Sequence, residues 1–252
     1  MRYIISVFLL LMTCGIVGQE YKSIHVMVAL CDNKHQGIVK VPKVIGNGQD
    51  PKNNLYWGCG YGISTYFKKS PHWKEVKRYA VDSIILERVV FKHKTRSWYL
   101  VADAYDGKRI STCTHDFLSA AAGRKIETID VDNTKVGIHG NSELISYIGH
   151  NGLMDFKLRN VYQNMDKKER KVIILACAAR NYFKSYLTNA NAYPLVWTTN
   201  LMAPEAYTLH DAIEAYLEGK SNEEVRESAA KAYSKFQKCS VKAAKGLLVT
   251  GW

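Results

Sequence analysis

The sequence predicts an α/β protein built on a mostly parallel sheet, with helices flanking both faces. Two apolar runs, residues 23–31 (SIHVMVALC) and 172–177 (VIILAC), are short and rich in β-branched residues, which is typical of strands buried on both faces. In the second half of the chain such runs alternate with segments of helical periodicity. Strands that alternate with helices form a parallel sheet, because each helical connection crosses one face of it.

In the first half, the strand at residues 23–31 is followed by a long loop at residues 33–60, rich in Gly, Asn and Pro. Loops of this length within a domain are commonly functional. The remaining elements expected in this half are a short helix at 62–70, two strands at 83–91 and 98–105 joined by a tight turn, and a helix at 114–122 that Gly123 ends.

The second half alternates more regularly. Strands are expected at 143–149, 172–177 and 193–199, and helices at 179–187, 203–219 and 221–237. Pro204 is placed in the first turn of the second of these helices, where proline is tolerated. Ser221 and Glu224 form a capping box at the start of the last helix.

The first residues carry the pattern of a secretory signal peptide, predicted at residues 1–18. Arg2 precedes a short apolar run, and small residues follow it. A lipid anchor on Cys14 is a less favoured alternative. Residues 19–252 are expected to form a single domain, without a later apolar run long enough to cross a membrane. The predicted destination is therefore the periplasm or the exterior of the cell.

The net charge of the chain is +12. Its lysines and arginines are scattered along the sequence, so a solvated basic surface is favoured and no nucleic-acid partner is expected. Of six cysteines, five follow the predicted signal peptide. An odd number leaves at least one thiol unpaired in an oxidising compartment. The sequence gives neither the disulfide pairing nor the oligomeric state.

Two candidate catalytic residues end two of the expected strands: His150 after residues 143–149, and Cys177 after the next apolar run. Reactive side chains of parallel sheets gather at the carboxyl ends of strands. A cysteine reacts as its thiolate, and a neighbouring histidine favours that form or takes the proton. Cys177 and His150 are therefore predicted to form a catalytic dyad, with a helix beginning just beyond the cysteine.

This pattern, an apolar strand with His-x-Gly followed by an apolar strand with Ala-Cys, resembles the caspase-like cysteine peptidases, which include gingipains, separases and CHAT domains. Residues 194–233 look like the ending of the CHAT type, and the resemblance spans residues 143–236. It implies a caspase-like fold, a peptide or protein substrate, Cys177 as nucleophile and His150 as base. It also implies an oxyanion hole formed by the backbone N–H groups of Gly152 and Cys177.

The chain departs from the family at two positions. Asn151 stands where the family usually has Gly directly after the histidine, and it is itself a candidate oxyanion or substrate-binding residue. Leu175 stands where members that cleave after basic residues carry Asp, so the resemblance does not imply cleavage after Arg or Lys. Asp155 is a candidate to orient His150 or line a pocket, and Trp197 to wall a substrate pocket, although a solvated turn and core packing are the simpler interpretations.

Two alternatives stay open. In the first, the caspase-like domain is a catalytically inert scaffold that binds a protein or an envelope polymer through its basic surface. In the second, Cys59, between glycines at the start of a helix, acts as a papain-like nucleophile with His139 or His150, although a disulfide there is simpler. Asp103 and Asp106 mark a turn more simply than a metal site. No metal and no cofactor are expected.

Overall fold

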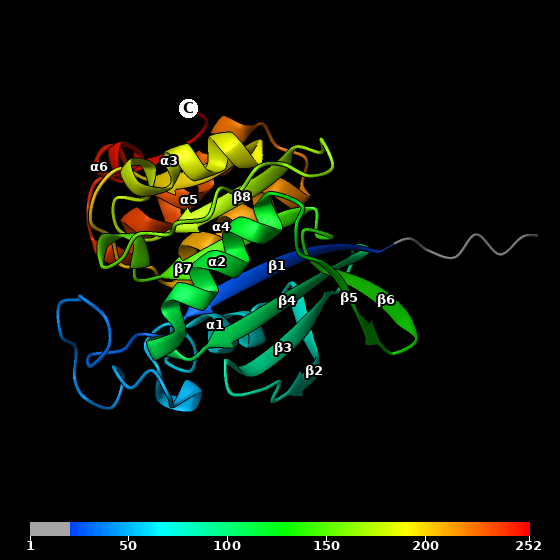
Figure 1. The fold of residues 1–252 in the computed structure, drawn as a ribbon, viewed down its shortest axis with the longest axis horizontal. Coiled ribbons are helices and arrows are strands. Elements are labelled where there is room, and N and C mark those ends of the chain that lie inside the picture. Colours follow the sequence, from blue (N-terminus) through cyan, green and yellow to red (C-terminus); the bar gives the residue numbers. More distant parts are fainter. Residues whose placement is uncertain (1–20) are drawn as a thin grey trace, which may run out of the picture.

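The computed structural model describes residues 21–252, so the predicted signal peptide at residues 1–18 and Cys14 lie outside the described part. The main sheet has the strand order β10-β9-β8-β7-β1-β4-β3-β2 (Figure 1). Its strands are β1 (Lys22–Ala29), β2 (Trp73–Tyr79), β3 (Ile85–His93), β4 (Trp98–Tyr105), β7 (Leu144–Gly149), β8 (Arg170–Leu175), β9 (Ala192–Thr198) and β10 (Leu248–Val249). The central strands β4, β1, β7, β8 and β9 are parallel, and the strands outside them run antiparallel to their neighbours.

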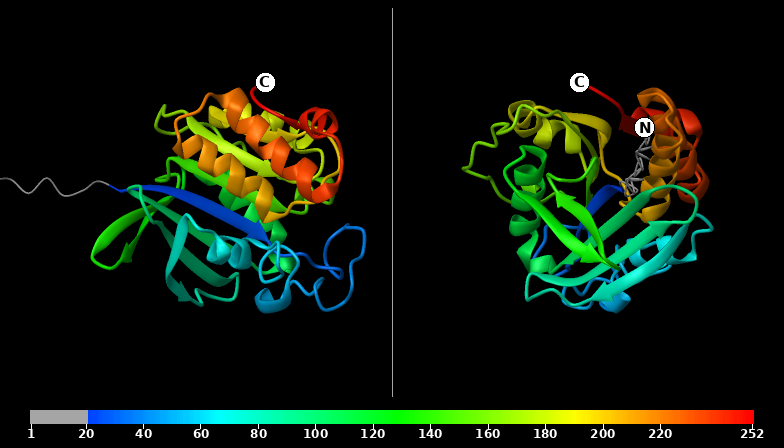
Figure 2. Two further views of the ribbon diagram at one scale, coloured as in Figure 1. Left: turned by 180° about the vertical axis from the view of Figure 1, so that it is seen from behind. Right: turned by 90° about the vertical axis from the view of Figure 1, so that its right-hand side faces the viewer.

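Helices cover both faces of this sheet, as predicted (Figure 2). On one face lie α1 (Ile63–Lys69), α4 (Ala206–Leu217), α5 (Asn222–Gln237) and α6 (Val241–Leu247), and on the other lie α2 (Ile110–Ala121) and α3 (Ala179–Ala190). The predicted capping box of Ser221 and Glu224 begins α5. The prediction for Pro204 was wrong, because α4 begins at Ala206 and Pro204 lies in the preceding loop.

Strand β1 lies at the centre of the sheet and is buried on both faces. Val26 and Val28 pack towards α4 and α5, whereas Met27 and Ala29 pack towards α2 and α3. Each fully buried aliphatic side chain of this size contributes about 1.5–3 kcal/mol. This two-sided burial explains why the strand reads as a continuous apolar run rather than an alternating one.

A separate hairpin, β5 (Ile126–Val131) and β6 (Thr134–His139), extends the covered face beyond α2. Its turn residues Asp132 and Asn133 both have positive φ, which suits a two-residue hairpin turn. Val136 and Ile138 of the hairpin pack on Val101 of β4. The hairpin therefore shields polar residues of the sheet that would otherwise meet water.

The shielded polar residues form a buried ionic cluster around Asp103. Arg88 donates two hydrogen bonds to this carboxylate, at 2.6 and 2.7 Å, and Nε2 of His25 donates a third at 3.0 Å. Burial alone would raise the pKa of Asp103, but these donors hold it well below its usual value. The backbone N–H of His139 donates to Nδ1 of His25 at 2.9 Å. Burial and the neighbouring His25 lower the pKa of His139 to about 2.

This cluster makes the fold sensitive to acid. Below a pH of about 6.5 the unfolded chain binds a proton at His139 that the folded chain refuses, so stability falls as the pH falls. His139→Asn removes this group, and Asn tolerates the positive φ of the position. Between pH 6 and 5 the free energy of unfolding of this variant should fall less steeply, by up to about 1.4 kcal/mol per pH unit. Urea unfolding of the parent chain and the variant at several pH values measures this difference. If the free energy of unfolding depends equally on pH in both proteins, the low pKa of His139 is contradicted.

Candidate active site at the carboxyl ends of β7 and β8

The structure brings His150 and Cys177 to the same edge of the sheet. Strands β7 and β8 are adjacent and parallel, with Ile148 opposite Leu175, so both chains leave the sheet at the same level. His150 and Cys177 both line one cavity of about 230 Å³. Gly149, directly before the histidine, has φ +132°, and a Cβ there would lie 2.5 Å from the carbonyl oxygen of Ala29. Only glycine therefore allows the strand to pass β1 and turn into His150.

Two partners fix the orientation of His150. Its Nε2 donates to Oδ2 of Asp155 at 2.8 Å, and the same oxygen accepts the backbone N–H of Gly37 at 2.9 Å. The hydroxyl of Tyr147 donates to the backbone carbonyl of His150 at 2.7 Å. With Nε2 bonded to a carboxylate, Nδ1 is the nitrogen that carries the lone pair of the neutral ring. Asp155 thus has the orienting contact that the sequence offered as one of its candidate roles.

The turn that carries Cys177 is held by hydrogen bonds on both sides. The hydroxyl of Thr198 donates to the carbonyl of Ala176 and accepts the N–H of Ala179 at 3.0 Å. The side-chain amide of Asn151 donates to the carbonyl of Cys177 at 2.7 Å. Ala178 adopts a left-handed conformation with φ 49°, which costs a non-glycine residue roughly 1–2 kcal/mol. The neighbouring contacts therefore hold Cys177 on a strained turn between strand and helix.

The Cys177 sulfur contacts the loop after β9. The N–H of Met202 donates to Sγ at 3.5 Å, and the thiol in turn contacts the carbonyl oxygen of Met202 at 3.7 Å. Helix α3 begins two residues after the cysteine, as predicted. The N–H groups of Ala178 and Ala179 donate to the carbonyl oxygen of Asn200 and the hydroxyl of Thr198, and so they do not donate to the thiol. No local signal in the sequence marks Met202 or Thr198 as neighbours of the cysteine, because only the tertiary fold brings them there.

Three other predicted site residues lie off the cavity. Gly152 is buried against Phe156 and is not one of the residues that line the cavity, where the implied oxyanion hole would need its N–H. Asn151 is buried, and it joins the two strand ends rather than contacting a substrate. Trp197 packs in the core between the sheet and α2 and α3, and its indole N–H donates to Gly251 at 3.0 Å.

The rival nucleophile Cys59 has a different environment. Its thiol contacts the carbonyl of Asn53 at 3.2 Å, and burial and the nearby Glu205 raise its pKa. A histidine partner would have the opposite effect. The rival base His139 packs against His25 in the buried ionic cluster. Cys59 and the other cysteines of residues 21–252 are free thiols.

The described residues offer one group of potential metal ligands, His72, His93 and Glu214, whose ligand atoms lie within 4.8 Å of one another. However, Nδ1 of His93 accepts the backbone N–H groups of Thr95 and Arg96, so the proton of the neutral ring sits on Nε2, the atom that faces Glu214. A metal ligand needs a lone pair on that nitrogen. This group is therefore a hydrogen-bonded cluster and not a preformed metal site.

Asp103, within β4, and Asp106, just after this strand, are also accounted for without a metal. Asp103 is engaged by Arg88 and His25, as described above. Asp106 accepts the backbone N–H of Lys108 at 3.0 Å and the side-chain amide of Gln49 at 2.6 Å. Both carboxylates therefore have protein donors. Asp106 caps the turn after β4, as predicted, whereas the prediction was wrong for Asp103, which lies within the strand.

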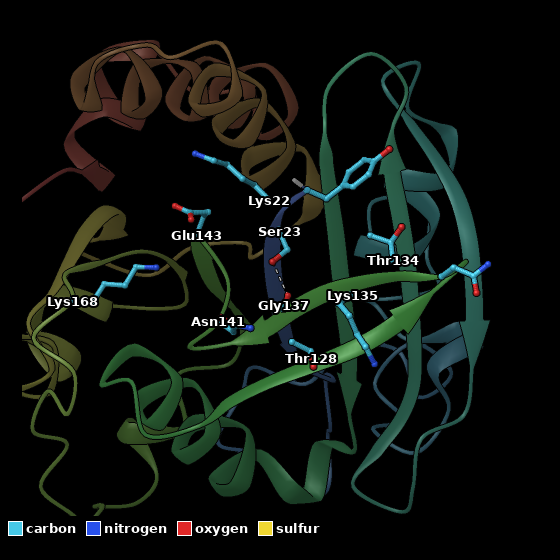
Figure 3. A pocket seen from close by; sticks show the side chains of 11 residues that line it. Lys22, Ser23, Thr128, Thr134, Lys135, Gly137, Asn141, Glu143 and Lys168 are labelled. Atoms are coloured by element: carbon cyan, nitrogen blue, oxygen red, sulfur yellow. Dashed lines mark hydrogen bonds between the residues drawn. The ribbon is translucent and has the colours of Figure 1, made fainter. Parts of the chain in front are cut away.

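A larger cavity of about 790 Å³ lies at the opposite end of the sheet, between the start of β1 and the β5–β6 hairpin (Figure 3). Its walls carry Lys22, Lys135 and Lys168 with several polar side chains. The hydroxyl of Ser23 donates to the carbonyl of Gly137 at 2.6 Å, and none of the described residues that line this cavity is a histidine that could act as its general base. Although it is larger, this cavity lacks the paired nucleophile and base of the smaller one.

Comparisons with family models, with curated proteins and with solved structures find no match for this chain. Within residues 21–252, none of the helices combines the length and the apolar character that a bilayer span requires.

We expect the bridge from Asn151 to be structurally important. Asn151→Ala leaves the buried carbonyl of Cys177 without this donor, which should lower the free energy of unfolding by about 1–3 kcal/mol. Asn160→Ala, an exposed position in the following loop, is the matched control and should change stability by less than about 0.5 kcal/mol. Urea unfolding of both variants measures this, and equal stabilities would show that the bridge does not hold the two strand ends.

Proposed function

We propose that the chain is an exported cysteine peptidase in which Cys177 is the nucleophile and His150 the general base, oriented by Asp155. One observation carries the proposal: Cys177 and His150 line the same cavity, and Nε2 of the imidazole is held by a carboxylate. Nucleophile, base and orienting group are the constituents of a catalytic triad. Export is supported by the sequence of residues 1–18 alone.

In the proposed reaction, Nδ1 of His150 takes the proton of the Cys177 thiol as sulfur attacks the carbonyl carbon of a peptide bond. The imidazolium then gives a proton to the leaving amine, the C–N bond breaks, and a thioester remains on Cys177. A water molecule, deprotonated by the same imidazole, attacks the thioester and releases the carboxylic acid and the thiol. The N–H of Cys177 is retained as an oxyanion donor in this scheme, and that of Gly152 is omitted because Gly152 does not line the cavity.

A second candidate function is an inert scaffold with the same fold, which binds a protein or an envelope polymer through its basic surface. It is favoured by the position of Gly152, which is buried against Phe156 and does not line the cavity, so that one donor of the oxyanion hole that the resemblance implies is missing there. The two candidates differ in one property. The peptidase requires a reactive Cys177, whereas the scaffold does not.

Alkylation with iodoacetamide, followed for each cysteine by mass spectrometry, tests the proposal. An ordinary thiol is only about 1% ionised at pH 6.5. At this pH we expect Cys177 to react at least about tenfold faster than Cys59, which is similarly half-buried. His150→Ala should remove this advantage at pH 6.5 and leave the rate at pH 9 little changed, because an ordinary thiol ionises there without help. Asp155→Asn should reduce the advantage only in part.

Circular dichroism and urea unfolding of each variant serve as controls for folding. The buried thiols of Cys31 and Cys113 provide internal references, because burial raises the pKa of Cys31 to about 11 and that of Cys113 well above its usual value. If Cys177 reacts only after unfolding, or reacts equally in the folded His150→Ala protein, the peptidase proposal fails and the scaffold is the better account.

A further inference from the structure

We infer that the cavity beside Cys177 selects a substrate with an uncharged aliphatic side chain, of about the size of leucine or methionine, next to the scissile bond. This inference rests on the proposed function and specifies its substrate class. The walls of the cavity are formed by Ile38, Val39, Met154, Leu201, Met202 and Pro204. They come from three separate segments of the chain, which meet around the thiol and the imidazole.

The exposure of these side chains indicates a binding surface. Val39 is 91% exposed, Leu201 66% and Met154 42%, yet all three line the same small cavity. Single exposed apolar residues are ordinary on a protein surface, but a contiguous group around a nucleophile is typical of a ligand site. A substrate side chain that entered the cavity would remove these residues from water.

The chemistry of the walls excludes charged side chains. Among the described residues that line the cavity, Tyr56 is the only titratable one apart from Cys177 and His150, and burial raises its pKa. An arginine, lysine, aspartate or glutamate side chain would thus lose its hydration without gaining a partner. The volume of about 230 Å³ is below the roughly 300–1,000 Å³ of pockets for drug-sized ligands, so it suits one side chain.

The wall that carries Val39 belongs to the long loop, which is fixed to the sheet. Asp32, buried just after β1, accepts the N–H of Lys34 at 2.9 Å and the side-chain amide of Gln49 at 2.8 Å. Farther along, the N–H of Gly37 binds the same Asp155 oxygen that holds His150. The residues before Val39 are therefore anchored to the carboxylate that orients the imidazole.

Chloromethyl ketones of acetyl-leucine, acetyl-arginine and acetyl-aspartate test this inference. In each reaction the Cys177 sulfur displaces chloride and forms a C–S bond, so the intact mass reports labelling without the need for turnover. Each rate is divided by the rate of the same reagent with glutathione, which removes differences in intrinsic reactivity. The leucyl reagent should label Cys177 at least about tenfold faster than either charged reagent.

Val39→Asp places a carboxylate in the cavity wall and should raise the arginyl-to-leucyl rate ratio about tenfold. Val44→Asp is the matched control, because Val44 is 63% exposed in the same loop but does not line this cavity. Its ratio should equal that of the parent chain. Both positions are exposed, so neither substitution should prevent folding.

Iodoacetamide labelling at pH 6.5 distinguishes a failure of the aliphatic selectivity from a failure of the proposed peptidase function. If Cys177 is labelled by iodoacetamide but reacts with the three ketones at equal rates, or fastest with a charged one, the aliphatic selectivity is wrong and the peptidase proposal stands. An unchanged ratio in Val39→Asp would likewise overturn the selectivity. If iodoacetamide does not label Cys177 in the folded protein, the proposed function fails and the selectivity fails with it.

Discussion

The parallel register of β7 and β8 is the constraint on which the rest of the site depends. Because Ile148 lies opposite Leu175, the two strands end at the same level and deliver His150 and Cys177 to one cavity. Burial of both strands on both faces fixes this register, since a slip by one residue would exchange the side chains that face the two helical layers. The pair is thus positioned by the core of the protein.

The strand ends alone do not orient the two side chains, and short polar contacts complete the arrangement. Asn151 ties the β7 end to the carbonyl of Cys177, and Thr198 ties the turn after β8 to β9. Asp155 joins His150 to the long loop. These contacts link four segments that are distant in sequence. A change in any of them should alter the geometry of the pair without touching either reactive atom.

The central parallel strands, most of the helices and the position of His150 and Cys177 at neighbouring strand ends could be predicted from the sequence, because buried parallel strands read as continuous apolar runs. Strands β2 and β5 could not, because their largely exposed residues mask the strand periodicity. Strand β6, helix α6 and the two-residue strand β10 were not predicted either. Spacing along the chain also does not tell which face of a sheet a residue occupies. For this reason Trp197 lies in the core beneath α2 and α3, and Gly152 against Phe156, away from the cavity.

The proposed dyad requires that the Cys177 sulfur and the His150 imidazole lie close enough to share a proton. Treatment with 1,3-dibromoacetone tests it most directly, because this reagent alkylates a reactive thiol first and then any nucleophile within the reach of its three-carbon chain. We expect one covalent cross-link per molecule, which joins the peptides that contain Cys177 and His150. An adduct on Cys177 that never reaches His150, or that bridges to another residue instead, would contradict it.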